Sequence, residues 1–262
     1  MTQRYALKIQ YLGKNYKGSQ KQVGVNTIQD EIEKALCTLI KESIKTIFSG
    51  RTDAGVSARC QVLHFDSNLI IENEAKFLNS LNALLPDDIR VFEIAKKDKT
   101  FHAQKSAMFR HYKYTIRNDF VENVFDRCVL FCKYKLNASR MNEALQYLLG
   151  EHDFSAFKSK SDNPACVCNI YFAQAKRSSD GKYITIDIIG NRFLYNMVRT
   201  IVGTLLMIEK DNLEPLSMFE ILKSKERANA GATADAKGLI LETVGYDNCL
   251  EYINKYIGKV HK

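Results

Sequence analysis

One glycine-bracketed loop holds the residues whose types and spacing most favour chemistry. Gly50 and Gly55 enclose residues 51–54, which read Arg-Thr-Asp-Ala. Glycines permit tight turns and let a ligand come close to the backbone. Among such small residues the carboxylate of Asp53 would be accessible, and Arg51 could bind a phosphate or hold Asp53 ionised. The alternative is an Asp-Ala-Gly turn beside a surface arginine.

Other common site patterns are absent from the sequence. The loop lacks the Gly-Lys-Ser/Thr ending of a P-loop and the Gly-x-Ser-x-Gly of a serine nucleophile elbow. Cys166 and Cys168 have no second pair at zinc-ligand spacing, and the five histidines form no His-Glu-x-x-His. We therefore expect no metal site and seven reduced cysteines.

The charge of the chain favours a polyanionic partner. Lysine and arginine number 38 against 30 acidic residues, a formal charge of +8. Residues 1–29 carry five basic residues without an acid before Asp30, and residues 99–118 carry five more, interleaved with aromatic residues. Basic groups attract phosphates and aromatic faces stack on bases, so nucleic acid is the expected partner. The alternative is a solvated strand face with ordinary lysines.

The hydropathy pattern predicts an α+β protein that would position these residues. Strands are expected at residues 4–11, 44–48, 61–66, 90–95, 108–117, 170–177, 182–189 and 239–244. Helices are expected at residues 28–41, 77–84 and 193–208, from Asn137 to Gly150, and a last one from Pro215. Hairpin signals such as Asp180-Gly181 indicate a largely antiparallel sheet. Two comparable halves, residues 1–104 and 105–262, are expected to share it.

Arg199 stands out because it is a charge on the most apolar predicted helix, residues 193–208. At about 100° per residue it projects about 200° away from Ile201, off the apolar stripe. A charge on such a helix needs a partner; the alternative is a surface arginine on the solvent face.

The chain contains no run of about 18 apolar residues, and its first residues show no apolar signal segment. We expect a cytoplasmic protein with no membrane partner.

Blocks of sequence along the chain resemble the TruA family of tRNA pseudouridine synthases. Residues 50–56 (GRTDAGV) resemble the active-site motif of that family. Further similar blocks stand in family order at residues 5–20, 82–89 (NALLPDDI), 101–107 (FHAQKSA), 110–114 (RHYKY), 149–157 (LGEHDFSAF), 193–203 (FLYNMVRTIVG) and 230–241 (AGATADAKGLIL). Together they span most of the chain.

The resemblance implies an activity, a substrate and an architecture. Such enzymes isomerise uridine to pseudouridine in tRNA, usually in the anticodon stem-loop around positions 38–40. They break the N-glycosidic bond, rotate the uracil and rejoin it through carbon 5, without cofactor or metal. The resemblance also implies a homodimer with RNA spanning both subunits. We expect two similar α/β-sandwich halves with helices packed on one side and a basic cleft between the halves, with Asp53 at its floor.

The resemblance assigns roles to five residues. Asp53 matches the catalytic aspartate, which can attack the sugar or base or abstract a proton. Tyr112 matches the tyrosine that stacks on the flipped uracil. Arg199 matches the arginine that pairs with the aspartate, and Arg51 one that helps displace the base and contact phosphate. Leu239 matches an apolar residue of the uracil pocket; Tyr112 and Leu239 could otherwise be core residues.

Six positions depart from the family pattern: Leu12, Ser19, Ser57, Gln104, Ala232 and Lys237. None removes a residue assigned to the chemistry, but several lie in segments expected to touch RNA. Two alternatives therefore stay open. The enzyme could act on another tRNA region or on ribosomal RNA, or the protein could be a non-catalytic RNA-binding or RNA-folding protein.

Overall fold

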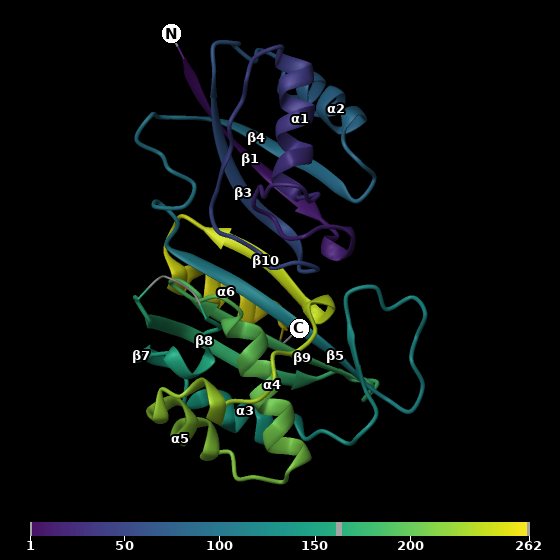
Figure 1. The fold of residues 1–262 in the computed structure, drawn as a ribbon, viewed down its shortest axis with the longest axis vertical. Coiled ribbons are helices and arrows are strands. Elements are labelled where there is room, and N and C mark those ends of the chain that lie inside the picture. Colours follow the sequence, from purple (N-terminus) through teal and green to yellow (C-terminus); the bar gives the residue numbers. More distant parts are fainter. Residues whose placement is uncertain (1, 161–163, 261–262) are drawn as a thin grey trace. The chain divides into compact units, whose positions relative to one another are not determined.

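The computed structural model describes residues 2–160 and 164–260 (Figure 1). Contacts within the chain divide it into two compact units. The first is Met1–Ala107 with Leu241–Tyr246, and the second is Met108–Ile240 with Asp247–Lys262.

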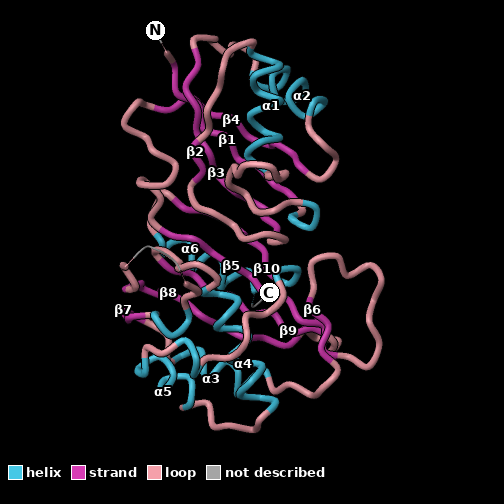
Figure 2. The backbone as a smooth tube through the Cα atoms, viewed as in Figure 1, coloured by secondary structure: helices cyan, strands magenta, loops and turns pink. Residues whose placement is uncertain are grey.

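The first unit is an antiparallel sheet covered by two helices. Its elements are β1 (Gln3–Tyr11), α1 (Ile28–Ile40), β2 (Ile47–Phe48), β3 (Ser57–Ser67), α2 (Glu74–Leu84), β4 (Ile89–Lys97) and most of β10 (Leu239–Gly245). Strand β1 lies between β3 and β4 and pairs antiparallel with both, while β2 pairs with β3. Helices α1 and α2 contact each other beside this sheet (Figure 2).

The pattern of β1 and α1 confirms the sequence prediction. The alternate residues Tyr5, Leu7, Ile9 and Tyr11 are all buried. The side chain of Thr27 accepts the amide of Asp30, 3.3 Å away, and so caps the start of α1. Burial of the apolar side of each element fixes which face of the strand meets the helices.

The second unit is an antiparallel sheet with helices on both faces. Its elements are β5 (Phe109–Asn118), β6 (Leu130–Cys132), α3 (Ala138–Gln146), β7 (Gly150–Asp153), β8 (Val167–Arg177), β9 (Tyr183–Gly190), α4 (Met197–Lys210), α5 (Ser217–Ser224) and α6 (Cys249–Val260). The strand order is β5-β9-β8-β7, all antiparallel, and β6 pairs parallel with β5. The α+β class and the mostly antiparallel sheet are therefore confirmed.

One helix of this unit, α6, was not predicted from the sequence. Helices α3, α4 and α5 contact one another, and α3 contacts β8. Helix α6 places Ile253 against Phe109 of β5 and Ile189 of β9. Successive side chains of a strand point to opposite faces of the sheet, so the strand neighbours of these two residues face the other side. Cys249, Tyr252, Ile253 and Tyr256 stand at helical spacing, so the signal for α6 was in the sequence.

Several other boundaries differ from prediction, and two short strands were not predicted. Helix α4 begins at Met197 rather than at residue 193, because Asn196 adopts a left-handed conformation with φ of 61°. Helix α3 ends at Gln146, and Gly150, with φ of 92°, opens β7 instead of ending the helix. Strands β6 and β7 are too short to leave a periodic signal in the sequence.

Among the described residues, no helix is both long and apolar enough to cross a bilayer.

Candidate active site

The loop that carries Asp53 joins β2 to β3 and is fixed through its neighbour Thr52. The amide of Thr52 donates to Ser19 Oγ over 2.8 Å, and the carbonyl of Thr52 accepts the amide of Ser19 over 3.1 Å. The hydroxyl of Thr52 lies 2.8 Å from the hydroxyl of Tyr11 on β1. Burial raises the pKa of Tyr11 to about 12, so this phenol is neutral around pH 7. All three hydrogen-bonding groups of Thr52 are thus held by buried partners.

The turn after Asp53 is closed by backbone bonds. The amide of Val56 donates to the carbonyl of Asp53 over 3.1 Å, and the amide of Gly55 donates to the carbonyl of Tyr16 over 3.3 Å. Gly55 has φ of 81°, a left-handed conformation that favours glycine. The prediction that this glycine makes a tight turn is confirmed.

Close packing against the segment after β1 completes the support of the loop. The amide of Gly13 donates to Ser57 Oγ over 3.0 Å. A Cβ atom at Gly13 would lie 2.1 Å from the carbonyl oxygen of Val56, so only glycine fits there. At Gly50, in contrast, a Cβ would meet nothing within 4 Å, which leaves space beside the backbone as the sequence suggested.

These contacts present Asp53 on a fixed backbone at the surface of the unit. Thr52 is buried, Asp53 is half-buried and Arg51 is exposed. A backbone held in this way reduces the ordering that the loop needs when a ligand binds.

Ser19 and Ser57 support the loop of Asp53, a role that the sequence did not reveal. They appeared only as departures from the family pattern, yet their hydroxyls hold the loop on both sides of Asp53. No local pattern links Ser19 to Thr52, which is 33 residues away, so only the fold reveals the pair.

Tyr112 lies on β5 in the second unit, opposite Ile188 of β9. Its ring is half-buried and meets the edge of Phe193, with ring centroids 5.1 Å apart at 85°. Edge-to-face packing is one of the favoured arrangements of an aromatic pair and restricts the plane of the tyrosine ring.

Arg199 lies on the first turns of α4 and is held by hydrogen bonds. Its Nε donates to the carbonyl of Ala234 and its Nη1 to Asn196 Oδ1, both over 2.8 Å. The amide of Ala234 returns a bond to the carbonyl of Arg199 over 3.1 Å. The alternative of a freely solvated surface arginine does not describe this side chain.

Leu239 begins β10 and is buried. The turn before it is held at Tyr114, whose hydroxyl donates to the carbonyl of Asp235 over 2.7 Å. A Cβ at Gly238 would lie 2.5 Å from the ring of Tyr114. The segment from Ala234 to Leu239 is therefore fixed to Arg199 at one end and to the strand of Tyr112 at the other.

The predicted residues form two groups. Arg51 and Asp53 belong to the first unit, and Tyr112, Arg199 and Leu239 belong to the second.

Comparisons with known proteins agree with the sequence motifs from which both groups of residues were predicted. Residues 8–104 and 144–247 match the family model described as tRNA pseudouridine synthase. The protein is 41% identical over 249 residues to tRNA pseudouridine synthase A of Bacillus subtilis, covering 94% of this chain and 100% of that protein. It is 42% identical over 256 residues to the Geobacillus kaustophilus protein of the same name, covering 95% and 97%.

The chain belongs to the tRNA pseudouridine synthase family. The predicted resemblance to the TruA enzymes and the prediction of an enzyme of this kind are confirmed. In this tRNA pseudouridine synthase the matched segments include Arg51, Asp53, Arg199 and Leu239, whereas Tyr112 lies in the stretch between them.

Proposed function

We propose that this tRNA pseudouridine synthase isomerises uridines of the tRNA anticodon stem-loop, around positions 38–40, with Asp53 as the catalytic carboxylate. The observation that carries the proposal is the support of Asp53. Thr52 is held at its amide, its carbonyl and its hydroxyl, and the turn after Asp53 is closed by two backbone bonds. A carboxylate fixed in this way can act as nucleophile or base with little cost in ordering.

The remaining site residues supply recognition. Tyr112 stacks on the flipped uracil with a ring already steadied by Phe193, and Leu239 provides an apolar wall. Arg199 matches the family arginine that pairs with the catalytic aspartate, and its guanidinium is already oriented by two hydrogen bonds. Arg51 is exposed on the catalytic loop, where it can contact phosphate and help displace the base.

The proposed setting is a cytoplasmic homodimer that binds tRNA. The net charge of +8 and the two acid-free basic stretches support an RNA partner. No step of the proposed reaction requires a cofactor or a metal.

A pseudouridine map of unmodified tRNA and ribosomal RNA tests the proposal. The wild-type protein is compared with Asp53→Asn and with the control Asp98→Asn, which changes an exposed aspartate of the same unit. We expect wild type and Asp98→Asn to modify the anticodon stem-loop. Asp53→Asn should lose roughly 10³-fold or more of the rate, because the proposed chemistry uses this carboxylate.

Two results would contradict the proposal. Pseudouridine could form at other positions and be lost in Asp53→Asn. That result would support the role of Asp53 but assign the target to another tRNA region or to ribosomal RNA. RNA binding without pseudouridine in any RNA would favour the non-catalytic RNA-binding alternative.

A further inference from the structure

One residue of the second unit has an unusual backbone conformation for its place in the fold. Asn196 directly precedes α4 with φ of 61°, in the left-handed region. The other left-handed residues besides glycine in the described chain are Lys41, Asn212 and Lys225, and each of them follows a helix, where this conformation is common. Before a helix extended backbone is usual, and it precedes α1, α2 and α3. The conformation of Asn196 therefore needs another reason.

The side chain of Asn196 also departs from the usual role of an asparagine before a helix. Such an asparagine normally accepts an amide of the first turn and so stabilises the helix. Within the described residues, the Asn196 side chain makes no such bond. Its Oδ1 instead accepts Nη1 of Arg199 over 2.8 Å. The left-handed backbone and the missing cap both lower local stability, so the arrangement serves the arginine rather than the helix.

Ser159 holds the other end of the same amide group. Asn196 Nδ2 donates to Ser159 Oγ over 2.9 Å, and the amide of Ser159 donates to the carbonyl of Tyr195 over 3.1 Å. Arginine has no acceptor, so the oxygen of the planar amide must be the atom that faces Arg199, and the nitrogen then faces the serine. A series of hydrogen bonds thus runs from Ser159 through Asn196 to Arg199.

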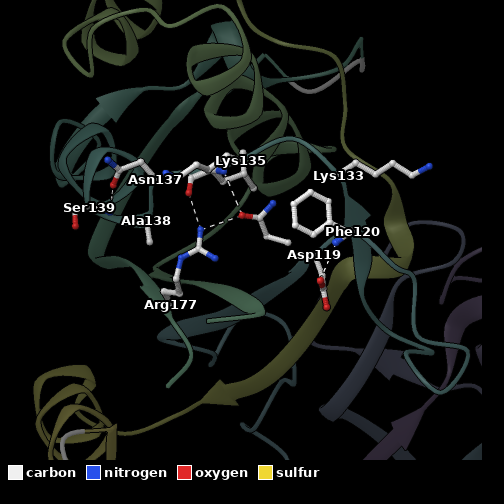
Figure 3. Close-up of a pocket in the computed structure, with 10 residues that line it drawn as sticks. Asp119, Phe120, Lys133, Lys135, Asn137, Ala138, Ser139 and Arg177 are labelled. Atoms are coloured by element: carbon white, nitrogen blue, oxygen red, sulfur yellow. Dashed lines mark hydrogen bonds between the residues drawn. The ribbon is translucent and has the colours of Figure 1, made fainter. Parts of the chain in front are cut away.

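Another asparagine–arginine pair of this unit shows a different use of the same contact. Arg177 of β8 (Figure 3) donates its Nη2 to Asn118 Oδ1 over 3.0 Å and to the carbonyl of Leu136 over 2.6 Å. Asn118 and Arg177 are 59 residues apart, so their bond joins distant parts of the unit. Asn196 and Arg199 are only 3 residues apart, and their bond links no distant elements. What it determines is the direction of a guanidinium.

We propose that Asn196 is a positioning residue for Arg199: its side-chain oxygen sets the direction of the guanidinium, and Ser159 sets the direction of that oxygen. The inference rests on the proposed function, in which Arg199 pairs with the catalytic aspartate. The guanidinium is held on two sides, at Nη1 by Asn196 and at Nε by the carbonyl of Ala234, both over 2.8 Å. An arginine oriented in advance needs less ordering when the uridine binds.

The test compares Asn196→Gly with Asn212→Gly, which changes the same residue type beyond the other end of α4. Both asparagines are left-handed, and glycine adopts this conformation without strain, so both variants should unfold at the same urea concentration. We expect Asn196→Gly to lower the single-turnover rate of pseudouridine formation roughly 10- to 100-fold, because a misdirected group slows the chemical step. Its Kd for tRNA should stay within about threefold of wild type, and Asn212→Gly should keep the wild-type rate.

Two further comparisons separate positioning from a general loss of structure. Ser159→Ala removes the acceptor of Asn196 Nδ2 and should slow the same rate roughly 3- to 10-fold, as expected for one hydrogen bond. Ser159→Thr keeps a hydroxyl and should recover most of that loss. In an Arg199→Ala background, Asn196→Gly should have no further effect, because no guanidinium is left to direct.

An Asn196→Gly protein as fast as Asn212→Gly would overturn the inference. Parallel losses of rate, tRNA affinity and urea stability would also overturn it, since they indicate a structural role. So would a further slowing of Arg199→Ala by Asn196→Gly. If Asn196→Gly does not give a native circular dichroism spectrum, the two Ser159 variants provide the test.

Failure of the proposed function gives a different result. If Arg199→Ala itself keeps the wild-type rate, Arg199 has no part in the chemistry and its proposed role is wrong. If Arg199→Ala is slow while Asn196→Gly is not, only the positioning role of Asn196 is contradicted.

Discussion

At the scale of single residues, the catalytic loop depends on side chains that do no chemistry. Ser19 is buried, and its hydroxyl is the acceptor for the amide of Thr52, the residue before Asp53. A buried amide that loses its acceptor carries the full cost of desolvation. The position of Asp53 is therefore coupled to the hydroxyl of Ser19.

Ser19→Ala should lower the free energy of unfolding by roughly 1–3 kcal/mol, because the amide of Thr52 loses its partner. It should also slow pseudouridine formation more than it weakens tRNA binding, since the carboxylate loses part of its support. Urea unfolding and single-turnover rates measure the two effects. Ser19→Thr, which keeps the hydroxyl, is the matched control. Equal stability of Ser19→Ala and wild type would show that the bond contributes nothing.

His64 links the stability of the first unit to pH. It is buried on β3, and its Nδ1 accepts the amide of Ala103 over 3.1 Å. Burial, together with Arg4 and His102 nearby, lowers the pKa of His64 to about 4. In the unfolded chain the pKa is near 6.5, so between these values the unfolded state binds more protons. Stability from this group is complete above pH 6.5 and is lost as the pH falls towards 4.

His64→Asn should remove this pH dependence, because the amide oxygen can still accept from Ala103 but cannot be protonated there. Between pH 7 and pH 5, wild type should lose roughly 2 kcal/mol more unfolding free energy than His64→Asn. Urea unfolding at both pH values gives the difference. Parallel losses in the two proteins would mean that His64 is protonated in the folded state at pH 5.

At the scale of elements, close backbone contact joins α4 to the segment that leads into β10. A Cβ at Gly203 of α4 would lie 1.6 Å from the carbonyl oxygen of Ala232, and one at Gly231 would lie 2.4 Å from the carbonyl oxygen of Gly203. The amide of Gly231 donates to Thr204 Oγ1 over 2.9 Å. Glycine lowers helix propensity, so its place inside α4 is explained by this contact. The contact also sets where Ala234 meets Arg199.

Gly203→Ala should destabilise the protein by roughly 2–3 kcal/mol, because the methyl group collides with a backbone atom that cannot move freely. Thermal and urea unfolding measure the loss. Gly50→Ala is the stability control, since its Cβ would meet no atom within 4 Å. If Gly203→Ala were as stable as that control, the two segments would not be in rigid contact.

At the scale of the whole molecule, the sequence and the structure answer different questions. The chain forms two compact units, and the first includes Leu241–Tyr246, a segment that comes late in the sequence. The charge of +8 and the motif blocks predicted an RNA-modifying enzyme of a specific family, and the comparisons confirm that family.

The sequence by itself determined the local structure and the identity of the chemical groups. The alternation in β1, the apolar stripe and cap of α1, and the glycine turn beside Asp53 follow from interactions between residues close in the chain. Short-range preferences of this kind can be read from a single sequence. An exception is Asn196, whose left-handed conformation delays the start of α4.

Only the tertiary structure decided which distant residues support the site. The pairs Ser19 with Thr52 and Gly203 with Ala232 join positions that no local pattern relates. Both depend on burial. Loss of a buried hydrogen bond costs free energy of unfolding, and a methyl group added at a close-packed glycine has no room. Burial is a property of the folded chain, so the scaffold of the site became visible only there.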